Sequence, residues 1–180
     1  MTPDARRPLA GGEVVVVGLG SNRPHGRYGA PERVVAAAVA ALAAHGLTVE
    51  AVAPVERTRP LGPAQRRFAN GAVRGRWPGT AQDLLRLLKS VERSFGRRPG
   101  GRRWGPRVLD CDLLVFGGQR IATRELVVPH PGLARRAFAL RPLVALWPDW
   151  RHPLLKRSAR QLWGRLAKPR PTRQGMRRGS

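Results

Sequence analysis

The sequence predicts an α+β fold in which helices pack on an antiparallel β-sheet. Short apolar runs rich in β-branched residues alternate with segments of helical periodicity, and clusters of glycine and proline separate them. The order of the predicted elements is β-α-β-β-α-β, followed by a hairpin and C-terminal helices. This order is typical of a ferredoxin-like α+β sandwich.

The first part of the chain predicts two strands and one helix. Val14–Val17 is a run of four valines that predicts a buried central strand, which ends in Gly18-Leu-Gly20. Pro31 and Gly46 bracket a helix, because proline suits its first turn and glycine the position after its last residue. Leu47–Val55 alternates weakly and predicts the second strand.

The middle of the chain predicts the third strand and the second helix. Arg57–Pro63 has three glycine or proline residues in seven, which excludes the interior of a helix or strand. Phe68–Trp77 predicts a strand, and Thr80 is a suitable N-cap for a helix that continues to Val91. Phe95–Arg103, rich in glycine and arginine, is expected to be a loop.

The last strand carries two carboxylates and leads into a hairpin. We expect the strand over Trp104–Phe116, a turn at Gly117-Gly-Gln119 and a return strand over Ile121–Val127. Leu133–Leu146 predicts a helix interrupted near Pro142.

Composition divides the 180 residues into one domain with two unstructured ends. Residues 1–11 and 167–180 have almost nothing to bury, so we expect a disordered N-terminal segment and a basic disordered tail. The folded domain then spans residues 12–166 and closes with a short helix over Ser158–Leu166. From Arg151 to the C-terminus the chain has ten Lys or Arg and no Asp or Glu.

The net charge indicates which classes of binding partner the protein favours. Lys and Arg number 34 against 11 Asp and Glu, and the resulting +23 favours polyanions such as nucleic acids, nucleotides or phosphorylated substrates. No apolar run approaches the ~20 residues needed to cross a membrane. The single cysteine, Cys111, excludes an internal disulfide framework. We therefore expect a cytoplasmic protein without membrane contact.

Asp110 and Asp112 are the strongest local signal for chemistry. Alternate residues of a strand point to the same face, which places the two carboxylates about 7 Å apart. Such a pair suits Mg²⁺, which takes one or two carboxylates together with phosphate oxygens. The alternative is that both carboxylates pair with nearby arginines, and spacing alone does not decide between the two.

Arginines flank this strand, among them Arg97 and Arg107. The guanidinium fork suits phosphate, and carboxylates for metal beside arginines for phosphate are typical of phosphoryl transfer. A solvated basic loop would look the same, because all but three of the 34 basic residues are arginine. Gly18–Asn22 lacks both the Walker lysine and the third glycine of a dinucleotide loop, so a structural turn is favoured there.

A few further residues could contact a ring-shaped ligand. Asn70 and Phe68 share one face of a strand, and a side-chain amide suits the edge of a heterocyclic base. Phe68 and Phe138 could stack on such a ring, or both could be core residues. His130, between two prolines, is by itself a structural residue more often than a catalytic one, and Trp104 could be a core anchor or a lid.

Five segments in order and spacing resemble the 6-hydroxymethyl-7,8-dihydropterin pyrophosphokinase family of the folate pathway. They are Gly20–Asn22, Arg57–Pro63, Phe68–Asn70, Arg103–Asp112 and Val128–Phe138. The resemblance covers about residues 14–165, and its most specific segment is Arg-Trp-Gly-Pro-Arg-x-x-Asp-x-Asp. It implies that the pterin hydroxymethyl oxygen attacks the β-phosphorus of ATP and that AMP leaves.

The resemblance also implies roles for individual residues. Asp110 and Asp112 match the carboxylates that hold two Mg²⁺ ions, and with Arg97 and Arg107 they form the implied catalytic set. The residues implied to bind ATP are Arg97, Arg107, Leu113, His130 and Arg136. The residues implied to bind the pterin are Thr58, Leu61, Phe68, Asn70, Trp104 and Phe138.

Two other hypotheses remain open at this point. Pro99-Gly-Gly101 departs from the family, in which a second arginine often stands at the place of Pro99, so the chain could be an enzyme relic. A basic ferredoxin-like nucleic-acid-binding module is the other alternative, although Val14–Val17 offers no aromatic side chain for stacking on bases. The resemblance implies small-molecule substrates, and we expect a monomer that binds no specific nucleic acid.

Overall fold

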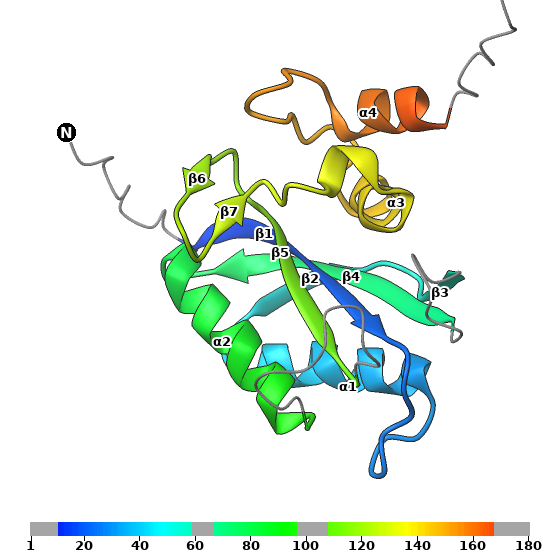
Figure 1. The fold of residues 1–180 in the computed structure, drawn as a ribbon. Coiled ribbons are helices and arrows are strands. Elements are labelled where there is room, and N and C mark those ends of the chain that lie inside the picture. Colours follow the sequence, from blue (N-terminus) through cyan, green and yellow to red (C-terminus); the bar gives the residue numbers. More distant parts are fainter. Residues whose placement is uncertain (1–10, 59–66, 97–107, 168–180) are drawn as a thin grey trace, which may run out of the picture.

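The computed structural model describes residues 11–58, 67–96 and 108–167 of the chain (Figure 1). Its helices and strands are β1 (Glu13–Ser21), α1 (Pro31–Ala44), β2 (Thr48–Val52), β3 (Glu56–Thr58), β4 (Phe68–Trp77), α2 (Ala81–Ser94), β5 (Asp110–Phe116), β6 (Ile121–Ala122), β7 (Val127–Val128), the 3₁₀ helix η1 (Leu133–Arg135), α3 (Ala137–Leu146) and α4 (Ala159–Leu166).

The main sheet is antiparallel, with strand order β2-β4-β1-β5 and β3 added beside β4. This is the strand order of a ferredoxin-like βαββαβ unit, so the predicted fold class is confirmed. Helices α1 and α2 cover one face of the sheet, and α3 and α4 lie on the other side (Figure 1).

Each face of the sheet has its own hydrophobic core, and β1 supplies both. Val15 and Val17 are buried against α1 and α2, whereas Val16 is buried in the cluster that includes α3 and α4. This follows from the alternation of side chains along a strand. The valine run therefore acts as the central strand that the sequence predicts.

Two helices begin as the sequence predicts. Pro31 is the first residue of α1, and Gly46 follows its end with a φ of +99°, a left-handed conformation that favours glycine. Thr80 caps α2 by accepting a hydrogen bond from the Asp83 amide, and the Asp83 side chain accepts one from the amide of Thr80 in return. This reciprocal pair is a capping box.

The turn predicted at Gly18–Asn22 is wrong for all but its last residue, because β1 continues to Ser21. Gly18 and Gly20 are central strand residues with partners on both sides, in β4 and in β5. Pairing on both sides keeps the backbone extended where glycine alone would favour a turn.

The predicted loop at Arg57–Pro63 is also wrong at its start. Arg57 and Thr58 belong to β3 and pair with Ala69 and Phe68 of β4. Residues 59–66 lie outside the described part of the chain. A short edge strand tolerates the glycine and prolines that follow it, because they come after its last pair.

The hairpin predicted at Gly117–Gln119 forms elsewhere. The amide of Gly117, at a φ of +52°, donates a hydrogen bond to the Val14 carbonyl at 2.7 Å and turns the chain away from β5. β6 then pairs with β7 in a separate two-stranded sheet, closed by the Thr123 amide bonding the Leu126 carbonyl. The strand before it begins at Asp110, so the prediction from Trp104 onward is too long within the residues that the structure describes.

The break predicted near Pro142 lies instead at Arg136, which has extended backbone between η1 and α3. Proline costs α3 one backbone hydrogen bond. The helix is nonetheless continuous around Pro142, because its buried face holds it on the sheet. The buried residues of that face are Ala139, Leu140, Leu143 and Leu146.

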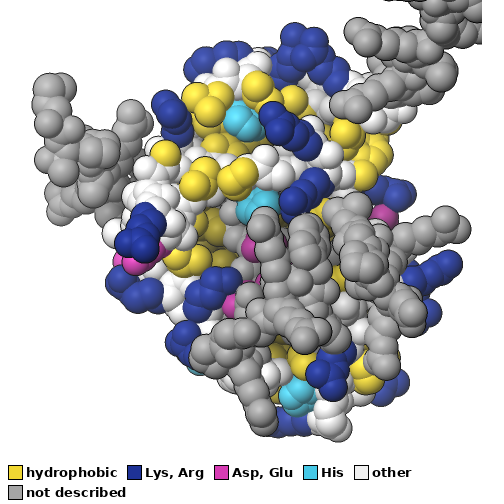
Figure 2. Space-filling view, in the orientation of Figure 1, with side chains coloured by type: hydrophobic (Ala, Val, Ile, Leu, Met, Phe, Trp, Pro, Cys, Tyr) yellow, Lys and Arg dark blue, Asp and Glu magenta, His cyan; other side chains and the backbone are white. Residues whose placement is uncertain are grey.

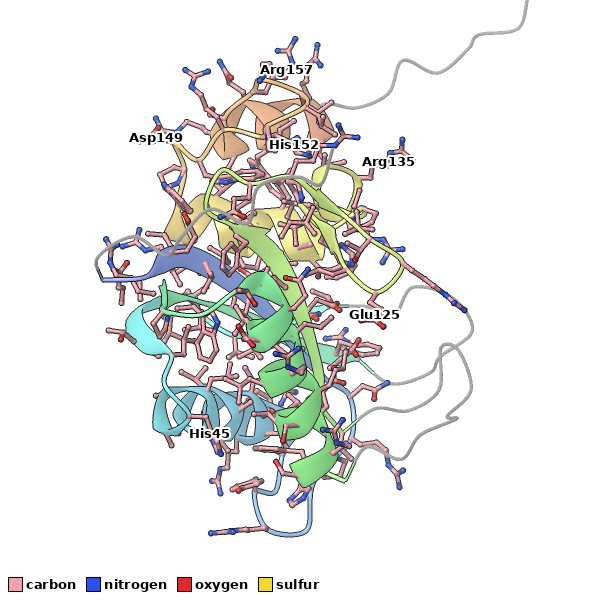
Figure 3. All side chains as sticks on the ribbon, turned by 90° about the vertical axis from the view of Figure 1, so that its left-hand side faces the viewer. His45, Glu125, Arg135, Asp149, His152 and Arg157 are labelled. Carbon is pink, nitrogen blue, oxygen red and sulfur yellow. The ribbon has the colours of Figure 1, made fainter. Side chains whose placement is uncertain are left out.

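The C-terminal part of the chain is tied to the sheet by side-chain hydrogen bonds. Arg74 of β4 donates to the carbonyl of Leu146 at 2.7 Å, and the Trp150 indole donates to the Gly117 carbonyl at 2.8 Å. Figure 3 shows His152 and Arg157 at this end of the molecule and His45 at the opposite end. Within the described ranges, no helix combines the length and the apolar character that a membrane span requires.

Candidate active site

Asp110 and Asp112 lie on β5 with one residue between them, so they share the face of the sheet that α3 also covers. Their cross-strand partners in β1 are Gly20 and Gly18. A Cβ at Gly18 would lie 3.3 Å from the Leu114 side chain, whereas a Cβ at Gly20 would come within 4 Å of Asn70 and Phe68. The predicted same-face placement of the two acids is therefore present.

Gly20 joins the carboxylates to a second group of predicted residues. Its partner in β4 is Asn70, so Asn70, Gly20 and Asp110 form one row across three strands. A Cβ at Gly20 would lie 3.3 Å from Asn70 Oδ1 and 3.9 Å from a ring carbon of Phe68. The amide and the aromatic ring thus lie beside Gly20, in the same row of strand residues as Asp110.

The amide of Asn70 is held in a fixed orientation. Its Nδ2 donates a hydrogen bond to Thr58 Oγ1 at 2.6 Å, across the pair of strands β3 and β4. Among the described residues, this contact leaves the second amide hydrogen and the carbonyl oxygen for another partner. Such a donor and acceptor side by side suit the edge of a heterocycle.

A third group comes from the segment between β7 and α3. The His130 amide donates to the Leu114 carbonyl at 2.9 Å, and its ring Nδ1 accepts from the Gly132 amide at 3.1 Å. A Cβ at Gly132 would lie 2.9 Å from the Arg136 side chain and 3.2 Å from the His130 ring. The absence of a side chain at Gly132 therefore lets a histidine and an arginine approach each other. The Arg136 guanidinium lies 5.9 Å from the centre of the Phe138 ring.

The two carboxylates repel each other. Burial raises the pKa of Asp112, the charge of Asp110 raises it further, and His130 and Lys89 act in the opposite direction. A divalent cation would relieve both the burial of charge and the repulsion. Within the described ranges no group of three or more His, Cys, Asp or Glu could hold a metal ion. The site offers two carboxylates, a set that fits Mg²⁺ when phosphate oxygens and water complete its coordination.

Leu113 lies on the opposite face of β5 from the two acids. Its side chain is 4% exposed and belongs to the core under α1 and α2. Only its backbone borders the carboxylates, and its place beside the adenine stays a prediction. Four other predicted residues lie outside the described part of the chain and stay predictions: Leu61, Arg97, Trp104 and Arg107. The same holds for the departure at Pro99-Gly-Gly101.

Glu92 of α2 is a residue that the sequence reasoning missed. It is 1% exposed, and its carboxylate accepts a hydrogen bond from the amide of Cys111, between the two acids. A signal was present, since Glu92 follows Leu84 and Leu88 at four-residue spacing and so falls on the apolar face of its helix. A charged residue on that face needs a partner inside the protein.

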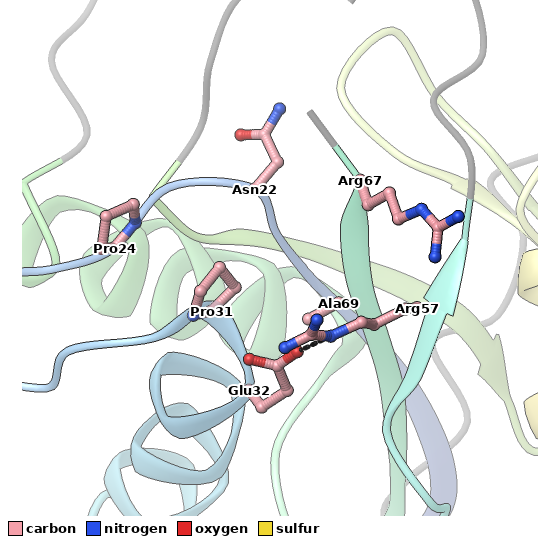
Figure 4. Close-up of a pocket in the computed structure, with 7 residues that line it drawn as sticks. All are labelled: Asn22, Pro24, Pro31, Glu32, Arg57, Arg67 and Ala69. Atoms are coloured by element: carbon pink, nitrogen blue, oxygen red, sulfur yellow. Dashed lines mark hydrogen bonds and ion pairs between the residues drawn. The ribbon is translucent and has the colours of Figure 1, made fainter. Parts of the chain in front are cut away.

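A separate pocket of about 240 Å³ lies at the start of α1 (Figure 4). Glu32 of α1 and Arg57 of β3 form an ion pair at its floor, and Arg67 and Asn22 line its sides. Ala69 also lines it and is adjacent in β4 to Asn70, so the pocket opens on the other face of that strand. It is thus distinct from the row of Asn70, Gly20 and Asp110.

Comparison with known proteins gives a consistent result. Residues 16–148 match the family described as 7,8-dihydro-6-hydroxymethylpterin-pyrophosphokinase. The 2-amino-4-hydroxy-6-hydroxymethyldihydropteridine pyrophosphokinase of Synechocystis sp. is 36% identical over 148 residues, which are 82% of this chain and 73% of that protein. The protein of the same name from Pseudomonas aeruginosa is 41% identical over 140 residues, 77% of this chain and 83% of the relative.

Longer relatives contain more than this chain does. It covers 27% of an Arabidopsis thaliana folate synthesis bifunctional protein, at 36% identity over 135 residues. Among solved structures, Plasmodium falciparum HPPK-DHPS matches with a TM-score of 0.64 and 12% identity. That match covers 85% of this chain and 44% of the Plasmodium chain, and it supports the fold.

Proposed function

The chain belongs to the 7,8-dihydro-6-hydroxymethylpterin-pyrophosphokinase family, and we propose that it transfers the diphosphate of ATP to the hydroxymethyl oxygen of this pterin. Membership makes it an enzyme with pyrophosphokinase activity in folate biosynthesis. In the proposed reaction a bond forms between that oxygen and the β-phosphorus. The bond from the β-phosphorus to the α-phosphate oxygen breaks, AMP leaves, and the hydroxyl proton is released.

The two same-face carboxylates are the observation that carries the proposal. We propose that Asp110 and Asp112 hold two Mg²⁺ ions together with oxygens of ATP. When bound, Mg²⁺ neutralises phosphate charge and aligns the reacting groups. Support comes from the two half-buried carboxylates, which share one face of β5 and repel each other.

The neighbouring residues divide between the two substrates. Asn70, oriented by Thr58, would form hydrogen bonds with the edge of the pterin. Phe68 and Phe138 would stack on either side of the pterin ring. His130 and Arg136 would contact the phosphates, since a guanidinium suits phosphate oxygens. Arg97 and Arg107, which lie outside the described residues, would add positive charge there. The monomeric state and the cytoplasmic location also remain proposals.

The decisive experiment is an assay of AMP formation with purified protein, Mg²⁺ and ATP, with and without the hydroxymethyl pterin. We expect AMP only when the pterin is present. Asp110→Ala and Asp112→Ala should abolish turnover and keep the circular dichroism spectrum of the parent. AMP formation that is independent of the pterin, or full activity in either variant, would contradict the proposal.

The assay also separates the two alternatives. A nucleic-acid-binding module would bind RNA tightly with a steep dependence on salt and form no AMP. An enzyme relic would bind ATP, in a titration with and without the pterin, and leave it intact. The family assignment does not favour either outcome.

A further inference from the structure

Glu92 connects helix α2 to the strand that carries the two acids. Its side chain is 1% exposed, and Oε1 accepts a hydrogen bond from the backbone amide of Cys111 at 2.8 Å. Lys89, one turn earlier in α2, donates to both carboxylate oxygens, at 3.0 and 3.1 Å. The lysine offsets the charge of the carboxylate, which would otherwise be costly to bury.

The position of β5 explains what this contact does. Among the residues that the structure describes, β5 is the last strand of its sheet and pairs with one strand, β1. The pairing with β1 holds Asp110 and Asp112 opposite Gly20 and Gly18. The amide of the residue between them bonds to α2 instead, which runs beside β5 in Figure 1. A backbone amide without that acceptor would be buried and unsatisfied.

We propose that Glu92 is a positioning residue that fixes the Asp110-Cys111-Asp112 segment from the edge facing away from β1 and thereby sets the affinity of the two carboxylates for a divalent cation. The segment is held by β1 on one side and by Glu92 on the other. Rotation of the strand about its axis would turn both carboxylates away from their shared face. The cation part of this inference rests on the proposed function, whereas the restraint on the strand does not.

Two variants at Glu92 separate the effect of side-chain length from the effect of charge. Glu92→Gln keeps the length of the side chain and the acceptor for the Cys111 amide, whereas Glu92→Asp keeps the charge but is one methylene shorter. We expect Glu92→Asp to bind Mn²⁺, with a non-hydrolysable ATP analogue present, about tenfold more weakly, the lower end of the loss seen when a group that holds metal ligands in place is removed. Glu92→Gln should stay within about threefold of the parent. Calorimetric titration gives both constants.

Val91→Ala is the matched control for stability. Val91 is buried in the same helix, next to Glu92, and its truncation lowers the melting temperature without removing the hydrogen bond to Cys111. The cation affinity of Val91→Ala should equal that of the parent. Equal loss of affinity in Val91→Ala and Glu92→Asp, or parental affinity in Glu92→Asp, would overturn the inference.

The single cysteine supplies a second readout that needs neither metal nor substrate. The Cys111 side chain is 1% exposed, so its reaction with an aromatic disulfide reagent reports opening of the strand. Glu92→Asp should react at least tenfold faster than Val91→Ala at a temperature where both are folded. In the parent, the Cys111 amide should exchange with solvent as slowly as that of Val17 in the centre of the sheet.

These readouts keep the two proposals apart. The parent protein could make no pterin-dependent AMP, while its Cys111 amide exchanges slowly and the Cys111 thiol reacts faster in Glu92→Asp. That result would contradict the proposed function and support the restraint of the strand by Glu92. Fast exchange of the Cys111 amide in the parent would overturn the restraint even if Glu92→Asp did not fold.

Discussion

Gly20 shows how far this site depends on one missing side chain. It stands between Asn70 and Asp110 in the row across three strands, and a Cβ there would come within 3.3 Å of the Asn70 amide oxygen. The sequence places Gly18 and Gly20 at the end of the predicted valine strand. It does not show which residues face them, because the register is set by pairing with distant segments.

We predict that Gly20→Val raises the KM for the pterin by about tenfold or more, since about 1.4 kcal/mol of binding is one factor of ten. The branched side chain would push against Asn70 and Phe68 and would cost about 1–3 kcal/mol of stability by overpacking. Steady-state kinetics at saturating ATP measure the change. Gly26→Ala is the control, because a Cβ there meets nothing within 4 Å. An unchanged KM in Gly20→Val would show that this row does not contact the pterin.

The buried charge of Asp112 leads to a prediction in which stability and activity move in opposite directions. Burial and Asp110 raise the pKa of Asp112, so folding opposes its ionised form at neutral pH. This penalty is fully present above the raised pKa and disappears as the pH falls below the pKa of the unfolded chain. Asp112→Asn removes the penalty and should raise the melting temperature of the metal-free protein, with roughly 2–4 °C corresponding to about 1 kcal/mol.

The same variant should be inactive, because an amide cannot replace the charge of a carboxylate. Calorimetry in a chelating buffer and the AMP assay are the two measurements. Asp149→Asn, at an exposed position, should change neither value. A lower melting temperature for Asp112→Asn would mean that other groups already balance this charge.

At the scale of elements, the sequence predicts well what local signals control. The N-cap at Thr80, the proline at the start of α1 and the valine run of β1 are all local, and all are present. The predictions that fail concern contacts between segments: strand pairing in most cases, and the packing of α3 on the sheet in the case of Pro142. β3 exists because it adds to the edge of β4, and β6 pairs forward with β7 because Gly117 leaves the sheet.

The cap of α2 allows a test of how far a helix terminus acts on a distant site. Thr80→Ala removes the acceptor for the Asp83 amide and should cost about 1 kcal/mol of the free energy of unfolding. Because the cap lies at the other end of α2 from Glu92, kcat should stay unchanged. Urea denaturation and the AMP assay measure the two quantities. Gln82→Ala, exposed in the same turn, is the control, and a large fall in kcat for Thr80→Ala would contradict this separation.

At the scale of the whole molecule, the fold class follows from the order of elements, whereas the placement of the charge does not. Figure 2 shows basic side chains gathered with exposed hydrophobic ones over α3 and α4. Leu154 and Leu155 are 57% and 47% exposed in the segment before α4. Like charge on one part of the surface attracts polyanions without selecting among them.

We therefore predict that removal of residues 168–180, which contain five Lys or Arg, weakens binding to single-stranded RNA and leaves AMP formation unchanged. For each RNA phosphate that the shortened chain no longer neutralises, the slope of log K against log salt should fall by about 0.7. Fluorescence anisotropy at several salt concentrations gives this slope. An unchanged slope would mean that the folded domain binds the RNA. A fall in AMP formation would mean that residues 168–180 contribute to the reaction.

The burial of Cys111 has a consequence for the conditions under which the enzyme can operate. Burial and the neighbouring carboxylates of Glu92 and Asp110 raise the pKa of its thiol well above the usual value. Peroxide reacts with the thiolate, and this sulfur is almost entirely in the protonated form. A cell under oxidative stress would therefore lose little of this activity to sulfur damage, although the only thiol of the chain stands between the two acids that we propose to hold Mg²⁺.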